Sequence, residues 1–430
     1  MKVFKIFVLY TLLYIFFIFV YNRFIADLFS YQGYFWNLNI IKIFTGILII
    51  LILSILLPKE FSKPSDLLIH IHFIFPFFFM LVLYAVENQA TIYILECFFA
   101  FSIILLITKI RLTFPILHIL EVNLQTIYKT LFIFFILYII VLSYKYKNYF
   151  NLNLSDVYYY RFEIEEISSG LWGYITHSLS IIFASFLGTI TLLKKRYGAF
   201  LLLILFYIII FALTSHKQYL FLLFMVMGLH FIIKILKNPI PFVPVILILI
   251  SILAIILDYL WFEPWIKALF IDRVFFVPVQ LNFVYYEFFS SNPKVFWTDS
   301  KWLLLDKIIG YPYDLPVPNV IGEFFFNNAL TSANTGWLGS GYAHAGFLGL
   351  IVYAIFIGLI LKFLDQKAKK LGKEFVFISF SPFIISLMLS SDLKTVLLSH
   401  GLALYLFILS TFNFRIDKSK SNFGGELYDK

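Results

Sequence analysis

The chain has 430 residues, of which 62% are hydrophobic and only 13% are charged, and its mean hydropathy is +0.93. Soluble domains carry about 25% charged residues, so a chain this apolar needs lipid around much of its surface and is not a soluble globular protein. Its formal net charge is +9, and its one cysteine, Cys97, excludes a disulfide scaffold.

Apolar runs recur from the first residues onward and predict an all-α, polytopic membrane protein with about 12 transmembrane helices. The first run follows Lys2 and Lys5, lacks a small-residue cleavage site and is followed by more spans. We therefore interpret it as an uncleaved helix rather than a signal peptide. The predicted spans are 4–21, 40–57, 67–86, 91–108, 127–144, 171–193, 198–214, 219–236, 241–260, 342–362, 374–391 and 395–412.

The distribution of lysine and arginine predicts the orientation. With Met1 inside, the predicted cytoplasmic segments hold 21 of the 33 basic residues, as expected from the excess of Lys and Arg on cytoplasmic loops. The positive charge therefore indicates topology and contact with anionic lipid rather than nucleic-acid binding.

Two sizeable segments remain on the predicted outer face of a single integral membrane domain, 1–430. The smaller is 145–170 and contains SDVYYYRFEIEEISSG; the larger is 261–341 and contains six prolines. A structureless loop of roughly 80 residues is uncommon, and its many aromatic residues are not typical of disorder. We predict short helices there, packed on the membrane domain, and expect the function on this face.

Motifs for nucleotides and metals are missing from the sequence. There is no G-x-x-x-x-G-K-[ST], G-x-G-x-x-G, H-E-x-x-H, C-x-x-C or D-x-D. We therefore expect no cofactor and no metal, and neither ATP nor a sugar nucleotide as a substrate. The remaining polar candidates lie in the predicted outer loops and at helix ends.

The cationic candidates each have a structural alternative. Arg161 follows DVYYY and precedes three glutamates that would pair with it, and Arg273 has Asp272 beside it. His216 and Lys217 lie in TSHKQYL, in a predicted turn between two apolar helices that needs polar residues in any case.

The acidic and histidine candidates also have both a functional and a structural interpretation. Glu323 lies in NVIGEFFFNN, where burial would raise its pKa toward that of a usable base, although a helix cap or an exposed position explains it equally well. Glu96 lies inside a predicted span, where a charge marks a functional site by default, unless it is a neutral packing residue. A histidine alone, such as His344, is more often a packing residue than a base.

A glycine-rich stretch, NTGWLGSGYAHAGFLGL, begins the tenth predicted span. Gly341, Ala345 and Gly349 recur four residues apart and predict a small-residue stripe where two membrane helices approach closely. An interfacial aromatic belt accounts for Trp337 and Tyr342. It does not account for Asn334 in the same stretch.

This stretch extends into GEFFFNNALTSANTGWLGSGYAHAGFLGLIVYAIFIGLILKFLD, preceded by RVFFVPVQLNFVYYEFFSSNP and YPYDLPVPNVIG. It resembles the bacterial O-antigen or capsular polysaccharide polymerase family, the oligosaccharide repeat-unit polymerases. The resemblance is clearest over 270–365 and weaker in SDVYYYRFE and TSHKQYLF. Some members carry paired Arg-x10-Gly motifs, but Arg161 has no glycine at that spacing, so roles tied to that motif are not carried over.

The resemblance implies a multi-pass glycosyltransferase of the bacterial inner membrane that acts on the periplasmic face. It would transfer a growing glycan from undecaprenyl diphosphate to the non-reducing end of a new lipid-linked unit. Its partners would be that lipid-linked oligosaccharide, membrane lipid, a chain-length regulator and a flippase.

Such a reaction needs cations for the charge that develops on the diphosphate and an acceptor for the hydroxyl proton. The catalytic candidates are Arg161 and Arg273 as cations, Glu323 as the first choice of base and His344 behind it. The substrate-binding candidates are His216, Lys217 (also a candidate cation), Asn334, Trp337 and Tyr342.

Three other functions remain open at this point. A flippase or transporter should show two comparable halves and sites near the midplane, whereas the long loop has no counterpart in the first half. An O-antigen ligase uses the same donor but passes the chain to a lipid A core, so its sequence requirements are the same. A non-catalytic assembly subunit is the third alternative.

Overall fold

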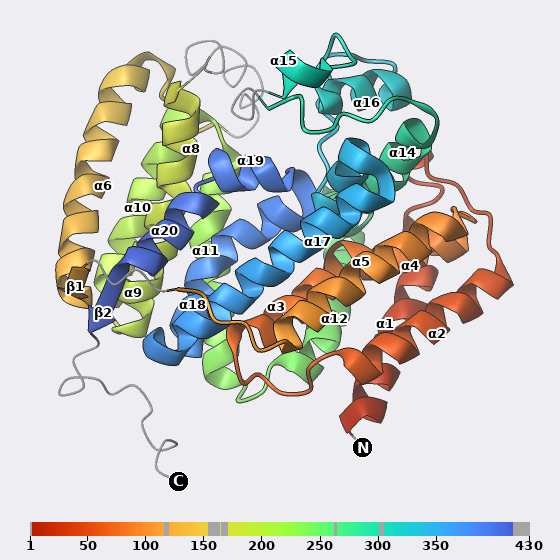
Figure 1. The fold of residues 1–430 in the computed structure, drawn as a ribbon, viewed down its shortest axis with the longest axis horizontal. Helices are drawn as coiled ribbons and strands as arrows, with labels where there is room; N and C mark the ends of the chain where they lie inside the picture. Colours follow the sequence, from red (N-terminus) through yellow and green to blue (C-terminus); the bar gives the residue numbers. More distant parts are fainter. Residues whose placement is uncertain are drawn as a thin grey trace. The chain divides into compact units, whose positions relative to one another are not determined.

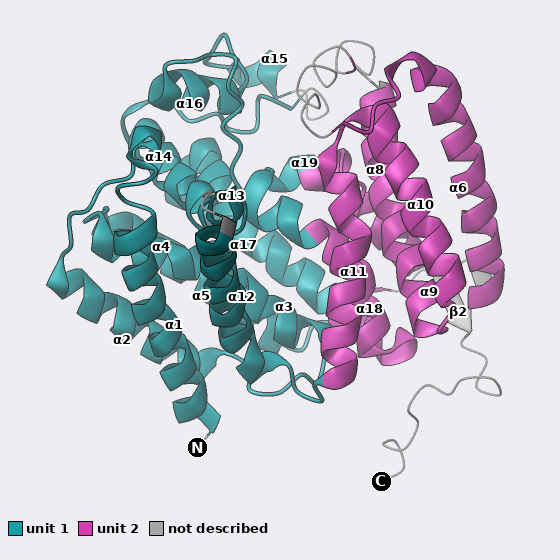
Figure 2. Ribbon diagram, turned by 180° about the vertical axis from the view of Figure 1, so that it is seen from behind, with its two compact units in different colours: residues 1–112, 236–363, 384–395 teal, residues 113–235, 364–383, 396–430 magenta. Residues whose placement is uncertain are grey.

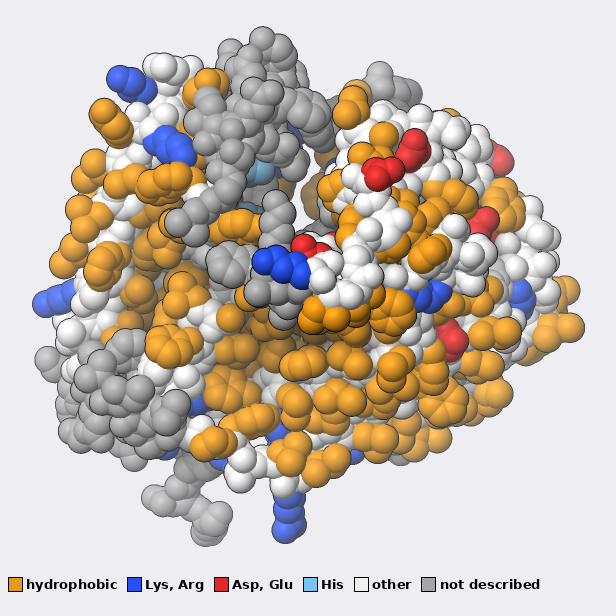
Figure 3. All heavy atoms as spheres, turned by 45° about the horizontal axis from the view of Figure 1, so that its top comes forward, with side chains coloured by type: hydrophobic (Ala, Val, Ile, Leu, Met, Phe, Trp, Pro, Cys, Tyr) orange, Lys and Arg blue, Asp and Glu red, His pale blue; other side chains and the backbone are white. Residues whose placement is uncertain are grey.

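The computed structural model describes residues 2–115, 120–153, 164, 171–261, 265–300 and 305–415. It is almost entirely helical (Figure 1), and the described part holds eleven helices that are long and apolar enough to cross a membrane. Many side chains on the face shown in Figure 3 are hydrophobic, as expected of helices in lipid. The predicted all-α, polytopic membrane protein is confirmed. Arg161 and most of the predicted outer segment 145–170 lie outside the described residues.

The chain forms two compact units, where the sequence predicts a single membrane domain (Figure 2). Unit 1 comprises residues 1–112, 236–363 and 384–395, and unit 2 comprises residues 113–235, 364–383 and 396–430. The longest helix, α17 (Trp337–Leu371), passes from the first unit into the second.

Unit 1 contains most of the helices that concern the site. They are α1 (Lys2–Phe24), α2 (Ile40–Leu56), α3 (Pro64–His72), α4 (Phe79–Val86), α5 (Thr91–Lys109), α12 (Val243–Trp261), α13 (Trp265–Lys267), η6 (Ala268–Phe276), α14 (Val277–Ser291), α15 (Asp306–Ile309) and α16 (Val317–Phe326). The α3 and α4 helices join through η2 (Phe73–Phe78) into one buried apolar segment. Near the end of unit 1, η8 (Ser386–Ser390) precedes α19 (Leu393–Leu398).

Unit 2 is built from a second set of apolar helices. They are α6 (Leu124–Tyr146), α8 (Leu171–Phe183), η4 (Ala184–Gly188), α9 (Thr189–Leu193), α10 (Tyr197–Thr214), α11 (Lys217–Ile235), α18 (Lys373–Phe380) and α20 (Leu402–Thr411). Its one described strand pair joins β1 (Leu120–Asn123) to β2 (Phe412–Arg415) in parallel.

The structure differs from the prediction at the start of the predicted outer loop 261–341. Trp265–Ser291 forms one helical segment of 27 residues, rather than short helices. The hydropathy pattern hides it because polar residues interrupt it, and some of these form hydrogen bonds with distant parts of the chain. Gln280 donates to the carbonyl of Gln32 at 3.0 Å, for example.

Both ends of this segment contact the same end of unit 1. At its start, Lys267 Nζ lies 5.3 Å from the centroid of Phe24, the last residue of α1. Near its finish, Tyr286 stacks on Tyr93 in the first turn of α5, with centroids 4.5 Å apart. The loop after α1 pairs with the end of α4, just before α5, through the N–H of Asn37. The segment therefore returns to the end at which it began, and α17 starts at that end.

A backbone break divides α17 at Ala345 and Gly346. Ala345 has φ −150° and ψ 29°, and Gly346 has φ +59° and ψ −140°, a conformation that glycine adopts at little cost. The predicted small-residue stripe is corrected here. A Cβ on Gly349 would lie 1.9 Å from the carbonyl oxygen of Gly341, so the close approach joins the two helical pieces of α17 on either side of the break rather than α17 and a separate helix.

Replacing Gly349 by alanine should therefore destabilise the protein, because the added methyl group meets a fixed backbone oxygen. Overpacking of this kind costs about 1–3 kcal/mol, measured as a lower thermal midpoint of the purified protein in detergent. Gly228→Ala on α11 is the matched control, since nothing lies within 4 Å of the added Cβ. Equal midpoints for wild type and Gly349→Ala would contradict this account of the break.

Candidate functional site

Unit 1 contains a polar cavity of about 110 Å³ at the end where α17 begins. Segments far apart in the sequence contribute to it, among them α14, the loop before α15, the first turns of α17 and the turn before α19. Its lining residues are Tyr285, Asp299, Val317, Pro318, Asn334, Thr335, Ser340, Ala343, His344, Ser391, Asp392 and Thr395.

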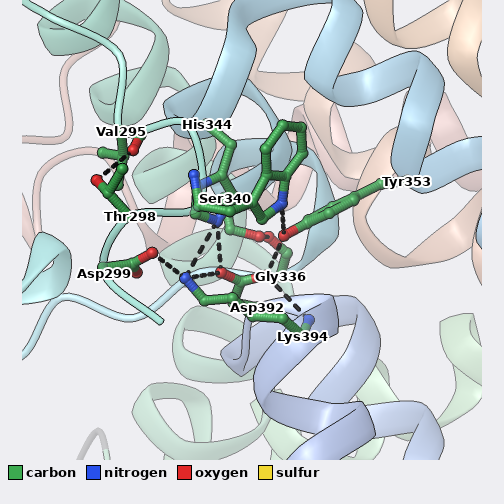
Figure 4. A network of polar contacts seen from close by, with 10 residues as sticks. Val295, Thr298, Asp299, Gly336, Ser340, His344, Tyr353, Asp392 and Lys394 are labelled. Carbon is green, nitrogen blue, oxygen red and sulfur yellow. Dashed lines mark hydrogen bonds and ion pairs between the residues drawn. The ribbon is translucent and has the colours of Figure 1, made fainter. Parts of the chain in front are cut away.

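A network of charged and polar side chains contributes Asp299, His344 and Asp392 to one wall of this cavity (Figure 4). His344 Nε2 lies 2.7 Å from Asp392 Oδ2, and Tyr353 donates its hydroxyl proton to Asp392 Oδ1. Lys394 Nζ contacts Asp392 Oδ2 at 3.2 Å and also donates to Asp299 Oδ1. The carboxylates of the two aspartates therefore share one ammonium group.

The break in α17 positions this network. It frees the carbonyl oxygens of Ala343 and His344, which accept hydrogen bonds from the N–H groups of Val295 at 3.0 Å and Phe296 at 2.9 Å. Unpaired backbone carbonyls in a buried helix are costly, so these hydrogen bonds hold the loop that contains Val295 and Phe296 next to the break. Three residues beyond Phe296, the same loop brings Asp299 to the cavity.

Trp297 holds the His344 ring from two directions. Its indole stacks on the imidazole with centroids 5.0 Å apart and an interplanar angle of 16°. Its backbone N–H donates to His344 Nδ1 at 3.2 Å, and its indole N–H donates to the Tyr353 hydroxyl at 3.0 Å. The ring orientation is thus set by backbone and side chain together.

These bonds fix the tautomer of His344. Because Nδ1 accepts a hydrogen bond from a backbone N–H, it carries no proton, and Nε2 must hold the proton that it donates to Asp392. The imidazole is neutral in this arrangement. Both of its nitrogens are occupied, so it is not poised to take a proton from a substrate.

Asp392 is the most fully satisfied carboxylate of the network. Oδ1 accepts from the Tyr353 hydroxyl and from the Lys394 backbone N–H, and Oδ2 faces His344 and the Lys394 ammonium. Burial by itself would raise the pKa of Asp392, but His344, Lys394 and Tyr353 outweigh it, and the pKa lies well below its usual range. Asp392 is therefore a permanent negative charge.

Asp299, His344 and Asp392 offer three ligand atoms within 4.8 Å of one another, a spacing that suits a metal ion. Lys394 Nζ contacts all three residues, and lies 3.4 Å from His344 Nε2. Its ammonium therefore holds the position that a cation would take. Two carboxylates, one ammonium and a neutral imidazole leave the wall with a net negative charge.

The structure does not bring the described members of the predicted site together. His344 and Asn334 line the cavity, whereas Arg273 on η6 and Glu323 on α16 are exposed and are not among its lining residues. Trp337 is completely buried at the start of α17.

Tyr342 is also buried, in an aromatic cluster with Tyr93 and Tyr286. His216 and Lys217 belong to unit 2, at the turn between α10 and α11.

Sequence reasoning missed the residues that make the network. Asp392 and Lys394 lie in SSDLKT, a short polar stretch between two predicted spans, and Asp299 lies in WTDS in the long outer loop. All three residues fall outside the predicted spans. Their convergence was not visible, because Asp299 and Lys394 are 95 residues apart in the sequence.

Comparisons with known proteins add no identity. No model of a known protein family matches the chain, and neither do any curated proteins or solved structures. The resemblance to polysaccharide polymerases therefore stays a prediction that rests on the residues that carry it.

Removing the ammonium should convert the network into a metal site. We expect Lys394→Ala to expose Asp299, His344 and Asp392 to solvent cations, so that Zn²⁺ raises the thermal midpoint of this variant but not of the wild type. Lys394→Ala combined with Asp299→Asn is the control, because it removes one ligand and should lose the Zn²⁺ effect. A wild-type protein stabilised by Zn²⁺ to the same extent would contradict the assigned position of the ammonium.

Proposed function

We propose that this protein is a membrane glycosyltransferase that polymerises lipid-linked oligosaccharide units, with the cavity of unit 1 as its active site. The observation that carries the proposal is a carboxylate-lined polar cavity, held by a rigid network, at the end of unit 1 where α17 begins. The residues that resemble polysaccharide polymerases surround the same cavity.

The charge of the cavity indicates which part of the reaction it serves. A diphosphate needs cations around it, but Lys394, the cation in this wall, is already shared by two carboxylates. A negative cavity suits a sugar hydroxyl that must lose a proton, or a sugar ring that gains positive charge as its bond to the diphosphate breaks. The cavity therefore binds the reacting sugars, and the diphosphate lies outside it, where the exposed Arg273 is a candidate contact.

The geometry favours Asp299 as the proton acceptor over Glu323 and His344. Among the described residues, Asp299 receives one side-chain hydrogen bond, from Lys394, and its side chain is 21% exposed. A carboxylate accepts about four hydrogen bonds, so Asp299 retains capacity toward the cavity.

In the proposed step, the oxygen of the acceptor hydroxyl bonds to the anomeric carbon of the donor. The bond from that carbon to the diphosphate oxygen breaks, the electron pair leaves with the diphosphate, and the hydroxyl proton passes to Asp299. Tyr353, Trp297 and Asp392 keep the surrounding network fixed during this transfer, as preorganised dipoles and charges should.

Deletion of the gene in the source strain tests the proposed function directly, through analysis of its surface glycans. Loss of a polymerase should leave single repeat units on the acceptor, because delivery and attachment of one unit do not need it. Loss of a ligase should leave no units on the acceptor, and loss of a flippase should leave undelivered intermediates. Either of the last two patterns would reject polymerisation.

Asp299→Asn should abolish long polymer while single units persist, because the amide keeps the shape of the side chain but cannot accept the proton. Loss of a general base lowers a rate about 10²–10⁴-fold. Asp314→Asn, an exposed aspartate in the same predicted outer loop, should leave chain length unchanged. Normal polymer from Asp299→Asn at wild-type abundance would remove Asp299 from the mechanism.

A further inference from the structure

A second polar site lies on α5, outside the cavity. Glu96 is partly buried inside this apolar helix, where a charged side chain is expensive and marks a functional site by default. No described group hydrogen-bonds its Oε2 atom, which is buried. Its charge nevertheless acts on Lys294, Tyr286 and Tyr342.

Three tyrosines form an aromatic cluster near Glu96, in which Tyr93 and Tyr342 are buried and Tyr286 is partly exposed. Tyr286 stacks on Tyr93 with centroids 4.5 Å apart and an interplanar angle of 21°, and Tyr342 lies 5.0 Å from Tyr286. Lys294 Nζ lies 5.0 Å from the centroid of the Tyr342 ring, a cation–π contact. Burial lowers the pKa of Lys294, and Glu96 offsets part of that effect.

The second site and the cavity lie on opposite faces of one short helical segment. Ser340 and His344, four residues apart, face the cavity, whereas Tyr342 lies two residues from each, which is about 200° around the helix. The loop that follows α14 carries Lys294 and continues to Asp299 in the cavity. A single loop thus supplies a charged residue to each site.

We propose that Glu96, Lys294, Tyr286 and Tyr342 form a subsite for a sugar ring of a lipid-linked glycan, an inference that rests on the proposed function. Sugars present apolar C–H faces to aromatic rings and hydroxyl groups to charged side chains. One carboxylate and one ammonium give a formally neutral site, which suits a hydroxyl-rich neutral ring and not a diphosphate with several negative charges.

An aromatic belt alone does not account for this arrangement. Interfacial tyrosines keep their rings at the headgroup level, but they do not require a glutamate within the helix beside them. The Oε2 atom of Glu96 is buried, so a sugar hydroxyl would donate to Oε1, the other oxygen of this partly buried carboxylate.

Photo-crosslinking in the source strain tests the subsite with its native lipid pool. With Tyr286 replaced by p-benzoylphenylalanine, irradiation should capture a lipid-linked glycan, from which mild acid releases sugar by cleaving the glycosyl diphosphate. Tyr259 on α12 is 79% exposed and is the control position. The same crosslinker there should capture phospholipid without releasable sugar. The same adducts at both positions, or no sugar at Tyr286, would overturn the proposal.

A second variant separates sugar recognition from simple proximity. Glu96→Gln should lower the yield of the glycan adduct at Tyr286 about tenfold, as expected for loss of a charge-assisted hydrogen bond. Glu287→Gln removes an exposed charge next to Tyr286 and should leave the yield unchanged. An unchanged yield in Glu96→Gln would reject the role of the glutamate.

The subsite and the proposed function fail in different ways. If deletion of the gene leaves single repeat units but the crosslinker at position 286 captures no glycan, the protein is a polymerase without this subsite. A glycan adduct at Tyr286 with an unchanged polymer after deletion would keep the sugar site and reject polymerisation.

Discussion

The break in α17 is the constraint on which both polar sites depend. A regular helix would use the carbonyls of Ala343 and His344 internally, whereas here Val295 and Phe296 donate to them. Gly346 permits this because its φ is +59°, which a side chain would disfavour. The exchanged backbone bonds attach the 294–299 loop to the helix, so Asp299 and Lys294 are placed by backbone geometry rather than by their own side-chain contacts.

The electrostatics follow from that placement. Asp299 and Asp392 come from distant segments, and two carboxylates this close would repel each other without Lys394 between them. A pair broken by removal of one partner leaves an uncompensated charge, which costs about 3–5 kcal/mol when buried. The ammonium therefore keeps the two carboxylates together and neutralises one of their two negative charges, so the network keeps a net negative charge.

Hydropathy was enough to predict the fold class, because long apolar runs have few alternatives to membrane helices. It failed for Trp265–Ser291, where Gln280 and other polar residues are satisfied by partners elsewhere in the chain. The small-residue pattern of Gly341 and Gly349 predicted close packing, but it could not show that the partner was the same helix. The break in α17 depends on hydrogen bonds from the backbone N–H groups of Val295 and Phe296, which no local sequence pattern reveals.

The site was only partly predictable for the same reason. His344 and Asn334 were found from the glycine-rich stretch, but the role of His344 depends on which nitrogen holds the proton, and that is set by Trp297, 47 residues away. Once Nδ1 accepts and Nε2 donates, both nitrogens of the histidine are engaged, and Asp299 is the aspartate of the network that receives fewer hydrogen bonds among the described residues. In the proposed reaction a carboxylate therefore takes the place of the histidine as the base, and its position in the site appears only when the loop, the broken helix and Lys394 are seen together.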